Sequence, residues 1–322
     1  MRAVRFSETG GPEVLRIEEI DDPTPGPGEL VVEVAAAGVN FIDTYHRTGL
    51  YTLELPSGLG LEGAGTVRAV GDGVAHRRVG DRVAWTDQLG SYGELATVAA
   101  ERTVVVPEEV DLEIAAATML QGITAHYLTS STYKLGSDDT ALVYAAAGGV
   151  GRLLVQLAKR RGARVLACTS TDEKEAEVRR LGADEVIRYR DVDIAQTVRE
   201  LTGGQGVEVV YDSVGADTFD ASLDCLRPRG MMVLFGSSSG KVAPIAPDIL
   251  NPKGSLFLTR PTVKHYVATR DELEWRAHAL FELVAQGQLE VHVHDRYPLD
   301  DVQRAHTDLE SGTTAGKLLL QP

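Results

Sequence analysis

The 322-residue sequence contains few cysteines and no excess of basic residues. Its two cysteines, Cys168 and Cys225, are too few for a disulfide framework or for a zinc site made of four thiolates. Lys and Arg number 32 against 47 Asp and Glu, which gives a formal net charge of −15. Because phosphate backbones and anionic lipids attract a basic surface, we expect neither nucleic acid nor a membrane as a partner.

Long apolar segments are also missing. The N-terminal residues MRAVRFSETGGPE lack the hydrophobic core of a signal peptide, and the longest uncharged stretch, residues 114–133, is interrupted by polar side chains. Hydrophobic residues nevertheless make up 43% of the chain and charged residues 25%, which is typical of a globular protein with a sizeable core. We therefore expect a soluble, cytoplasmic protein, and at roughly 100–200 residues per domain the length predicts two domains.

The first hundred residues alternate between turns rich in Gly and Pro and short segments typical of β-strands. Strands are predicted at residues 30–37, 65–71, 81–85 and 103–107. Such closely spaced strands favour a small, partly open antiparallel barrel.

From about residue 123 the pattern changes to strands that alternate with helices. Strands are predicted at 141–145, 163–168, 185–187, 207–211 and 231–235, and helices at 150–161, 173–181, 194–201 and 219–226. Units of this size predict βαβ crossovers and a doubly wound parallel sheet of the Rossmann type. In the last fifty residues we expect one good helix, at 271–286, and a short closing segment, 315–322.

A glycine-rich turn lies between the first strand and the first helix of this second region. It reads Ala146-Ala147-Gly148-Gly149-Val150-Gly151. Gly148 and Gly149 would let backbone N–H groups approach a pyrophosphate, and Gly151 would let the helix pack closely. Alanine replaces the first glycine of the dinucleotide fingerprint, so a tight turn that binds nothing is the alternative. The βα units that follow favour the dinucleotide.

The end of the second strand of this region indicates which dinucleotide binds. An NAD site usually has an acidic residue about 20 residues beyond the turn. Residues 168–170 are Cys-Thr-Ser, whereas Lys174 lies just beyond and can face a 2′-phosphate. Asp172 and Glu173 argue against this, but Glu173 has capping-box spacing from Ser170 and would then face its own backbone. NADPH is therefore the expected cofactor, with a solvated helix charge as the alternative role of Lys174.

Further motifs are spread almost from end to end of the chain. They include GPEVL at 11–15, GVNFIDTY at 38–45, GAG at 63–65, GDRV at 80–83, YDSVG at 211–215, FG at 235–236, TRP at 259–261 and GK at 316–317. Together with the glycine-rich turn they resemble the medium-chain dehydrogenase/reductase superfamily, and within it the zinc-free NADPH:quinone oxidoreductases. The stretch 40–51 is similar to the quinone-reductase branch in particular.

The resemblance implies a GroES-like catalytic domain of residues 1–122 and 264–322, with a Rossmann NADPH-binding domain of residues 123–263 between them. It also implies that no metal is bound. The zinc alcohol dehydrogenases have Cys, His and Cys where this chain has Asn40, Leu61 and Gln121. The one remaining carboxylate, Glu62, is not sufficient for a three-ligand zinc site.

By the same resemblance, three side chains form the catalytic site. Asn40 would lie near the nicotinamide and donate its amide to the cofactor or to a quinone oxygen, and an Asx turn is its alternative role. Tyr45 and Tyr51 would line the substrate pocket, each with an aromatic face and a hydroxyl for the quinone. Either tyrosine would otherwise be a half-buried core residue.

The remaining expected cofactor contacts are divided along the chain. Ser170 and Lys174 are assigned to the 2′-phosphate and Tyr189 to the adenine end, with packing over the sheet as the alternative for Tyr189. Thr124, which would otherwise bond to a helix carbonyl, is expected near the domain junction. Lys317 would reach the cofactor or remain a solvated charge. The strand-end positions Ser213, Phe235 and Gly236 complete the set together with Asn40, Gly148, Gly149, Val150 and Gly151.

The expected function is reduction of a quinone by NADPH without a metal. A quinone is already electrophilic, and its reduced form spreads charge over an aromatic ring, so geometry can replace a Lewis acid. Reduction of an activated carbon–carbon double bond of an alkenal or enoyl compound is one alternative, and a non-catalytic NADPH-binding role is another. Family resemblance also suggests a homodimer that forms through an edge strand near residues 255–259.

Overall fold

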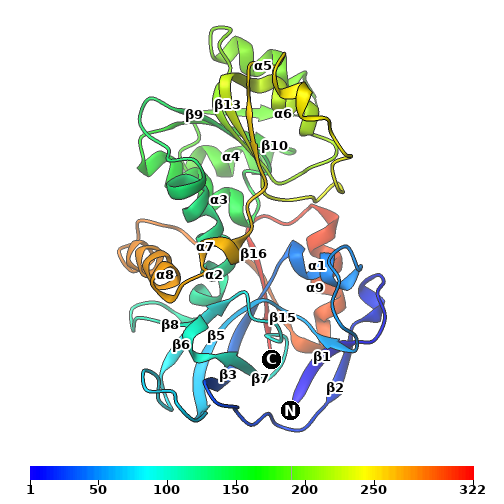
Figure 1. The fold of residues 1–322 in the computed structure, drawn as a ribbon, viewed down its shortest axis with the longest axis vertical. Helices are drawn as coiled ribbons and strands as arrows, with labels where there is room; N and C mark the ends of the chain where they lie inside the picture. The colour runs from blue at the N-terminus through cyan, green and yellow to red at the C-terminus, as the bar shows by residue number, and fades with distance from the viewer. Residues whose placement is uncertain (190) are drawn as a thin grey trace. The chain divides into compact units, whose positions relative to one another are not determined.

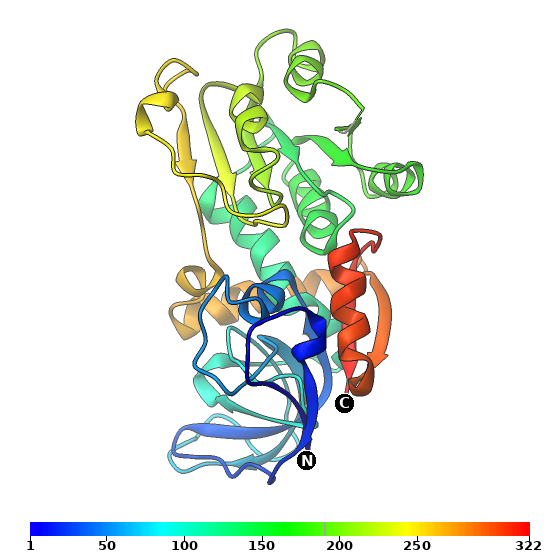
Figure 2. The same ribbon diagram turned by 90° about the vertical axis from the view of Figure 1, so that its right-hand side faces the viewer.

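The computed structural model describes residues 1–189 and 191–322, which divide into two units. Unit 1 comprises Met1–Ile123 and Tyr266–Pro322, and unit 2 comprises Thr124–His265. Figures 1 and 2 show unit 1 in blue to cyan and in orange to red, and unit 2 in green to gold. Within the described residues, no helix combines the length and the apolar character that crossing a bilayer requires.

Unit 1 is built around a seven-stranded sheet with the order β15-β16-β3-β5-β6-β8, and β7 also pairs with β3. Its pairs are antiparallel except for β15 with β16. A second sheet has the order β2-β1-β4. The strands are β1 (Arg2–Phe6), β2 (Arg16–Glu19), β3 (Glu29–Val39), β4 (Ser57–Gly58), β5 (Glu62–Val70), β6 (Arg82–Thr86), β7 (Leu95–Ala99), β8 (Thr103–Val105), β15 (Val293–Pro298) and β16 (Lys317–Gln321). The predicted antiparallel barrel of short strands is therefore confirmed.

Four α-helices of the described residues belong wholly or partly to unit 1, and a short fifth helix lies at its second boundary. They are α1 (Phe41–Arg47), α2 (Leu112–Tyr127), which continues into unit 2, α8 (Arg270–Ala285) and α9 (Val302–Ser311), and the short α7 (Val263–Tyr266) lies at the second boundary. The expectation of a single helix in the last fifty residues is wrong, because α9 is a second one. Its buried residues Val302, Ala305, His306 and Leu309 follow helical spacing, and Gly312, at φ 68°, ends it.

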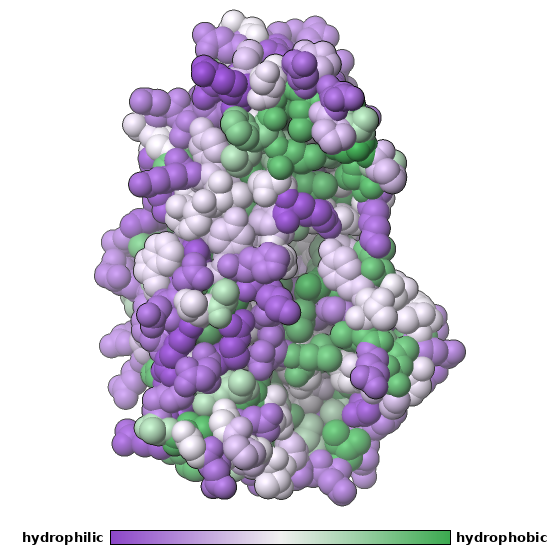
Figure 3. All heavy atoms as spheres, viewed as in Figure 1, coloured by the Kyte–Doolittle hydropathy of each residue, from purple (hydrophilic) through white to green (hydrophobic). Residues whose placement is uncertain are grey.

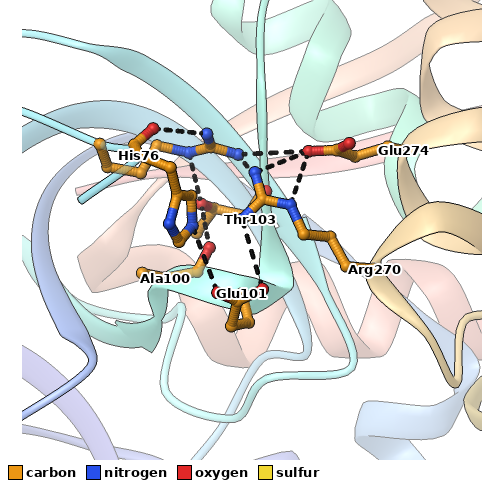
Figure 4. A network of polar contacts seen from close by, with 7 residues as sticks. His76, Ala100, Glu101, Thr103, Arg270 and Glu274 are labelled. Carbon is orange, nitrogen blue, oxygen red and sulfur yellow. Dashed lines mark hydrogen bonds and ion pairs between the residues drawn. The ribbon is translucent and has the colours of Figure 1, made fainter. Parts of the chain in front are cut away.

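A network of polar contacts fixes α8 to the segment formed by η2 (Ala100–Arg102) and β8. Arg270 donates from Nε and Nη2 to Glu274 Oε1 at 2.9 and 2.8 Å, and from Nη1 to Glu101 at 3.3 Å. The buried Arg77 donates to the hydroxyl and the carbonyl of Thr103 at 3.0 and 2.6 Å. Figure 4 shows Arg270 and Glu274 facing Glu101 and Thr103 across this junction. These contacts join the two sequence segments of unit 1.

Unit 2 is a six-stranded parallel sheet with the order β11-β10-β9-β12-β13-β14. The strands are β9 (Thr140–Val143), β10 (Arg164–Thr169), β11 (Glu185–Arg188), β12 (Val207–Asp212), β13 (Leu226–Leu234) and β14 (Phe257–Thr259). The helices between them are α3 (Gly149–Arg160), α4 (Asp172–Arg180), α5 (Ile194–Leu201) and α6 (Phe219–Cys225). The predicted doubly wound sheet is confirmed.

One strand of unit 2 begins earlier than predicted. Strand β13 starts at Leu226 rather than at Met231, and its register with β12 shifts between Val207 and Val209. Pro228 and Gly230 make this segment look like a turn in the sequence, whereas an irregular strand accommodates both residues.

Candidate functional site

The glycine-rich turn follows β9 and leads directly into α3. Gly148 is the N-cap and the helix begins at Gly149, one residue before the predicted start. A methyl group on Gly151 would lie only 2.3 Å from the carbonyl oxygen of Ala145. Ala145 itself has φ 46°, which is unusual for a residue with a side chain. Absence of a Cβ at Gly151 therefore allows the close approach of helix and turn that a pyrophosphate cradle needs.

The start of α4 differs by one residue from the predicted capping box. Thr171, not Ser170, is the N-cap, and its side chain accepts from the backbone N–H of Lys174 at 3.3 Å. The Ser170 capping box is therefore wrong, because both residues are good caps and the helix uses the second. Hydrogen bonds from its own backbone N–H and from the Thr171 hydroxyl lower the pKa of Glu173, which does face the local backbone. Lys174 lies in the first turn, as predicted.

The neighbouring strand end contributes a residue that the sequence reasoning missed. Arg188 is the last residue of β11, and its Nη1 donates to Asp172. Its Nε donates to Asp191 at 3.1 Å. Arg188 is paired in register with Thr169, the residue that precedes Ser170. This strand pairing, which the structure supplies, places Arg188 beside the predicted 2′-phosphate residues.

Two further observations concern Thr169 and Tyr189, which lie at the carboxyl ends of β10 and β11. The Thr169 hydroxyl is buried and has no hydrogen-bond partner in the described part of the chain, at the carboxyl end of β10. The Tyr189 ring meets the Tyr144 ring edge-on, with centroids 5.9 Å apart, and packs against the core of unit 2. A buried hydroxyl without a partner, beside a cradle that a Cβ would fill, fits a nucleotide with polar groups at this edge of the sheet.

The loops after β12 and β13 touch one another. The Phe235 N–H donates to the Asp212 carbonyl at 2.8 Å, and a methyl group on Gly236 would lie 2.4 Å from the Ser213 carbonyl oxygen. The buried Asp212 carboxylate organises this region by accepting four hydrogen bonds, from Val214 N, Gly215 N, Thr218 Oγ1 and Ser222 Oγ, at 2.7, 3.1, 2.7 and 2.8 Å. Ser213 and Gly236 thus present backbone groups at the carboxyl ends of parallel strands, where open α/β sheets bind ligands.

Unit 1 contains a buried polar cluster formed by four distant segments. The Lys317 ammonium donates to Glu62 Oε1 and, at 2.8 Å, to Asn40 Oδ1. Gln121 Nε2 donates to the same Asn40 oxygen at 3.2 Å, and the Leu120 N–H donates to Glu62 Oε2 at 2.6 Å. The exposed fractions of the Lys317 and Glu62 side chains are 1% and 0%. Burial lowers the pKa of Lys317, and the Glu62 carboxylate opposes that shift.

The cluster determines what Asn40 can do. Its Nδ2 donates to Glu62 Oε1 at 2.7 Å and to the Gly38 carbonyl at 3.2 Å. Both amide hydrogens are therefore used within unit 1, and donation to a bound molecule would require one of these bonds to break. Glu62 and Gln121 were considered in the sequence only as failed metal-ligand positions, yet the same correspondence identifies them as members of the cluster.

Tyr45 on helix α1 and Tyr51, which follows the end of that helix, are the predicted substrate-binding tyrosines, and both come soon after Asn40 in the chain. The Tyr45 and Tyr51 rings meet edge-on with centroids 5.4 Å apart, and the Tyr51 N–H donates to the Tyr45 carbonyl at 3.0 Å. Both side chains are half-buried. The structure thus brings these two residues together on the segment that begins at Asn40.

The start of α1 is fixed by a buried carboxylate. Asp43 Oδ2 accepts from the Asn40 N–H at 2.8 Å and from the Tyr92 hydroxyl at 3.0 Å. Burial raises the pKa of Asp43 to about 7, and the two hydrogen bonds partly counteract this effect. Because Tyr92 is buried in the core of unit 1, these contacts hold the start of α1 against that core and thereby help to position Tyr45.

The site residues predicted from the sequence therefore fall into two groups. In unit 2, the glycine-rich turn, Ser170, Lys174, Tyr189, Ser213, Phe235 and Gly236 all follow the carboxyl ends of parallel strands. In unit 1, Asn40 and Lys317 are in contact, and Tyr45 lies against Tyr51. Thr124 is a buried residue of α2, at the first position of unit 2.

Comparison with known proteins agrees with this arrangement. The family described as the alcohol dehydrogenase GroES-like domain matches residues 26–135, and the zinc-binding dehydrogenase family matches residues 149–285. Quinone oxidoreductase 1 of Escherichia coli is 46% identical over 323 residues, which cover 99% of each chain. A 2-haloacrylate reductase of Burkholderia is 42% identical over 99% of this chain and 98% of its own.

Solved structures of quinone oxidoreductases are also similar to this chain. The structure of Escherichia coli quinone oxidoreductase complexed with NADPH matches with a TM-score of 0.98 and 46% identity over 100% of both chains. A mycobacterial protein complexed with NADPH matches with a TM-score of 0.97 and 48% identity, also over 100% of both chains. The chain belongs to the quinone oxidoreductases of the medium-chain dehydrogenase/reductase superfamily.

Proposed function

We propose that this chain is a zinc-independent oxidoreductase that reduces a quinone with NADPH. Residues 123–263 are assigned to cofactor binding, and residues 1–122 with 264–322 to catalysis. The observation that carries the proposal is the buried cluster of unit 1. Where zinc alcohol dehydrogenases have metal ligands, this full-length relative of quinone oxidoreductases has Asn40, Leu61 and Gln121, and a lysine ammonium contacts Asn40 and Glu62.

The residues have distinct roles in this proposal. NADPH, when bound, supplies the hydride. The turn at 148–151 binds the pyrophosphate through backbone N–H groups and the start of α3, and Ser170 with Lys174 binds the 2′-phosphate. Tyr45 and Tyr51 offer an aromatic face and hydroxyls to the quinone. Asn40, held by Lys317, Gln121 and Glu62, fixes the start of α1 and thereby the tyrosine pair.

Reduction of an activated carbon–carbon double bond is a second candidate, because a relative that is 42% identical over nearly its whole length is named 2-haloacrylate reductase. Such a substrate also accepts a hydride without a metal if a carbonyl or carboxyl group withdraws electrons from the double bond. The same cofactor site serves both reactions, so the two candidates differ only in what the tyrosine face accepts.

Steady-state turnover tests the two candidates together. We expect 1,4-benzoquinone or 9,10-phenanthrenequinone to drive loss of NADPH absorbance, with NADPH preferred to NADH and no effect of a metal chelator. Turnover with 2-haloacrylate or crotonaldehyde and none with quinones would replace the first candidate by the second. Tight NADPH binding without turnover on either substrate class would contradict both candidates and favour a non-catalytic role.

We also propose a homodimer that forms through strand β14. Among the described residues this strand pairs with β13 alone, so its other edge is available for a second copy. Its Phe257 and Leu258 side chains are 57% and 36% exposed. Figure 3 shows hydrophobic atoms, coloured green, at the surface over unit 2. An exposed apolar edge strand is a common surface for pairing between copies.

Light scattering during size-exclusion chromatography tests the dimer. We expect Phe257→Asp to convert the protein to a monomer, because a carboxylate would be buried at the strand edge of both copies. Val79→Asp is the matched control, since Val79 is 64% exposed in unit 1 and is not part of this edge. A dimer that persists in Phe257→Asp, or a wild-type protein that is monomeric, would refute the assembly.

A further inference from the structure

The sequence contains an apparent conflict at the proposed 2′-phosphate site. Lys174 favours NADPH, but Asp172 and Glu173 precede it at the start of α4. A 2′-phosphate placed beside an unpaired carboxylate would be repelled. The pKa of Glu173 is lowered by its own backbone N–H and by the Thr171 hydroxyl, which indicates that this carboxylate faces the local backbone. Asp172 is then the carboxylate that would repel the phosphate, and its side chain is 83% exposed.

Arg188 engages this remaining carboxylate. It comes from the neighbouring strand, because β11 lies parallel to β10 and places Arg188 opposite Thr169 at the same edge of the sheet. Its Nη1 donates to Asp172, and its Nε donates to Asp191 at 3.1 Å. The guanidinium is therefore held at the first residue of α4, two positions before Lys174.

The geometry leaves the guanidinium suited to an anion. Asp172 and Asp191 contact Nη1 and Nε, whereas a guanidinium carries five N–H donors in a planar fork that matches phosphate oxygens. The buried Thr169 hydroxyl, without a partner among the described residues, lies one residue before Ser170 at the same edge. The Thr169 hydroxyl is thus next to Ser170 in the chain, and the Arg188 cation is next to the same segment across the β10–β11 pair.

We propose that Arg188 determines the preference for NADPH by neutralising Asp172 and by donating, together with Lys174, to the 2′-phosphate. This inference rests on the proposed binding of the 2′-phosphate by Ser170 and Lys174. It assigns a role to a residue outside the glycine-rich turn and α4. Without Arg188 the phosphate would meet the Asp172 carboxylate directly, and the site would lose its discrimination against NADH.

The test compares dissociation constants, measured by calorimetry on the whole protein, for NADPH, NADH, adenosine 2′,5′-bisphosphate and ADP. We expect Arg188→Gln to weaken binding of both 2′-phosphorylated molecules by roughly tenfold or more, as for loss of a hydrogen bond between charged groups. Binding of NADH and ADP should change less than about twofold, since neither carries the phosphate that meets the guanidinium. Adding Asp172→Asn to Arg188→Gln should restore part of the lost affinity, because the repelling carboxylate is then gone.

Two controls make the result specific. Arg180→Gln removes an exposed arginine that bonds to Glu177 and is the last residue of α4, at the opposite end of that helix from Lys174, and should change none of the four constants. Lys174→Gln should weaken the 2′-phosphorylated molecules alone. If Lys174→Gln has this effect and Arg188→Gln does not, the inference fails while the proposed cofactor site stands.

Other outcomes are equally decisive. If Arg188→Gln weakens NADPH and NADH equally, Arg188 acts on the fold of the site and not on the phosphate, and the inference is refuted. If neither Lys174→Gln nor Arg188→Gln changes the ratio of the NADPH and NADH constants, the 2′-phosphate binds elsewhere and both proposals fail. A change of that ratio by Arg188→Gln alone would support Arg188 and transfer the role of Lys174 to it.

Discussion

Replacing Lys317 with methionine is expected to destabilise the protein by about 3–5 kcal/mol, the usual cost of removing one partner of a buried ion pair. Both side chains of the Lys317–Glu62 pair are almost completely inaccessible to solvent. Of its partners in the described part of the chain, the substitution leaves the Glu62 carboxylate the N–H donors of Asn40 and Leu120. Urea denaturation followed by circular dichroism measures the change in the free energy of unfolding.

Two variants complete this experiment. Glu62→Gln in the Lys317→Met background should recover much of the loss, because the uncompensated charge is then removed. Lys253→Met breaks a surface pair with Asp224 and should cost no more than about 1 kcal/mol. Equal effects of Lys317→Met and Lys253→Met would show that the pair in the cluster contributes no more than an ordinary surface contact.

Gly151→Ala is expected to weaken NADPH binding by more than about tenfold and to cost about 1–3 kcal/mol of stability, as overpacking typically does. The added methyl group would lie 2.3 Å from the carbonyl oxygen of Ala145 and 2.7 Å from the Cα of Ala146. Both are backbone atoms, so helix α3 and the turn must separate to accommodate it. Separation removes the alignment of N–H groups on which anion binding at a helix start depends. Calorimetric titration with NADPH and thermal unfolding measure the two effects.

Gly148→Ala is the matched control for this substitution. Gly148 has φ −74°, which suits any residue, and its methyl group would have a nearest neighbour at 3.1 Å. We expect its melting temperature to stay within a few degrees of wild type, whatever happens to NADPH affinity. A Gly151→Ala protein with unchanged melting temperature would contradict the packing argument, and one with unchanged NADPH affinity would contradict the assignment of the turn.

The sequence was more informative for unit 2 than for unit 1. Strands β10 and β12 are buried along almost their whole length, and such parallel strands appear as continuous apolar segments that need no partner to be recognised. Helix α1 has only seven residues and is too short for a clear helical period. Strand β15, with three exposed residues in succession, lacks the alternation of a half-buried strand.

The site residues, too, were only partly predictable from local sequence patterns. Asn40 and Lys317 were identified as important through a family resemblance, but their contact joins residues 277 positions apart, which local patterns do not encode. Likewise, the choice of Thr171 over Ser170 as the N-cap depends on one residue of helix register between two equally suitable side chains. Arg188 became visible only when the register of β10 and β11 was known.

The buried cluster of unit 1 also has a consequence for the order in which the protein folds. Unit 2 is one uninterrupted segment, Thr124–His265, whereas unit 1 is assembled from the chain on either side of it. Lys317 reaches Glu62 only when β16 pairs with β3, a closure across the entire inserted unit. Contacts of such high sequence separation form slowly. We therefore expect the Glu62 side chain to stay hydrated during synthesis until the distal segment arrives, and unit 1 to complete its fold after unit 2.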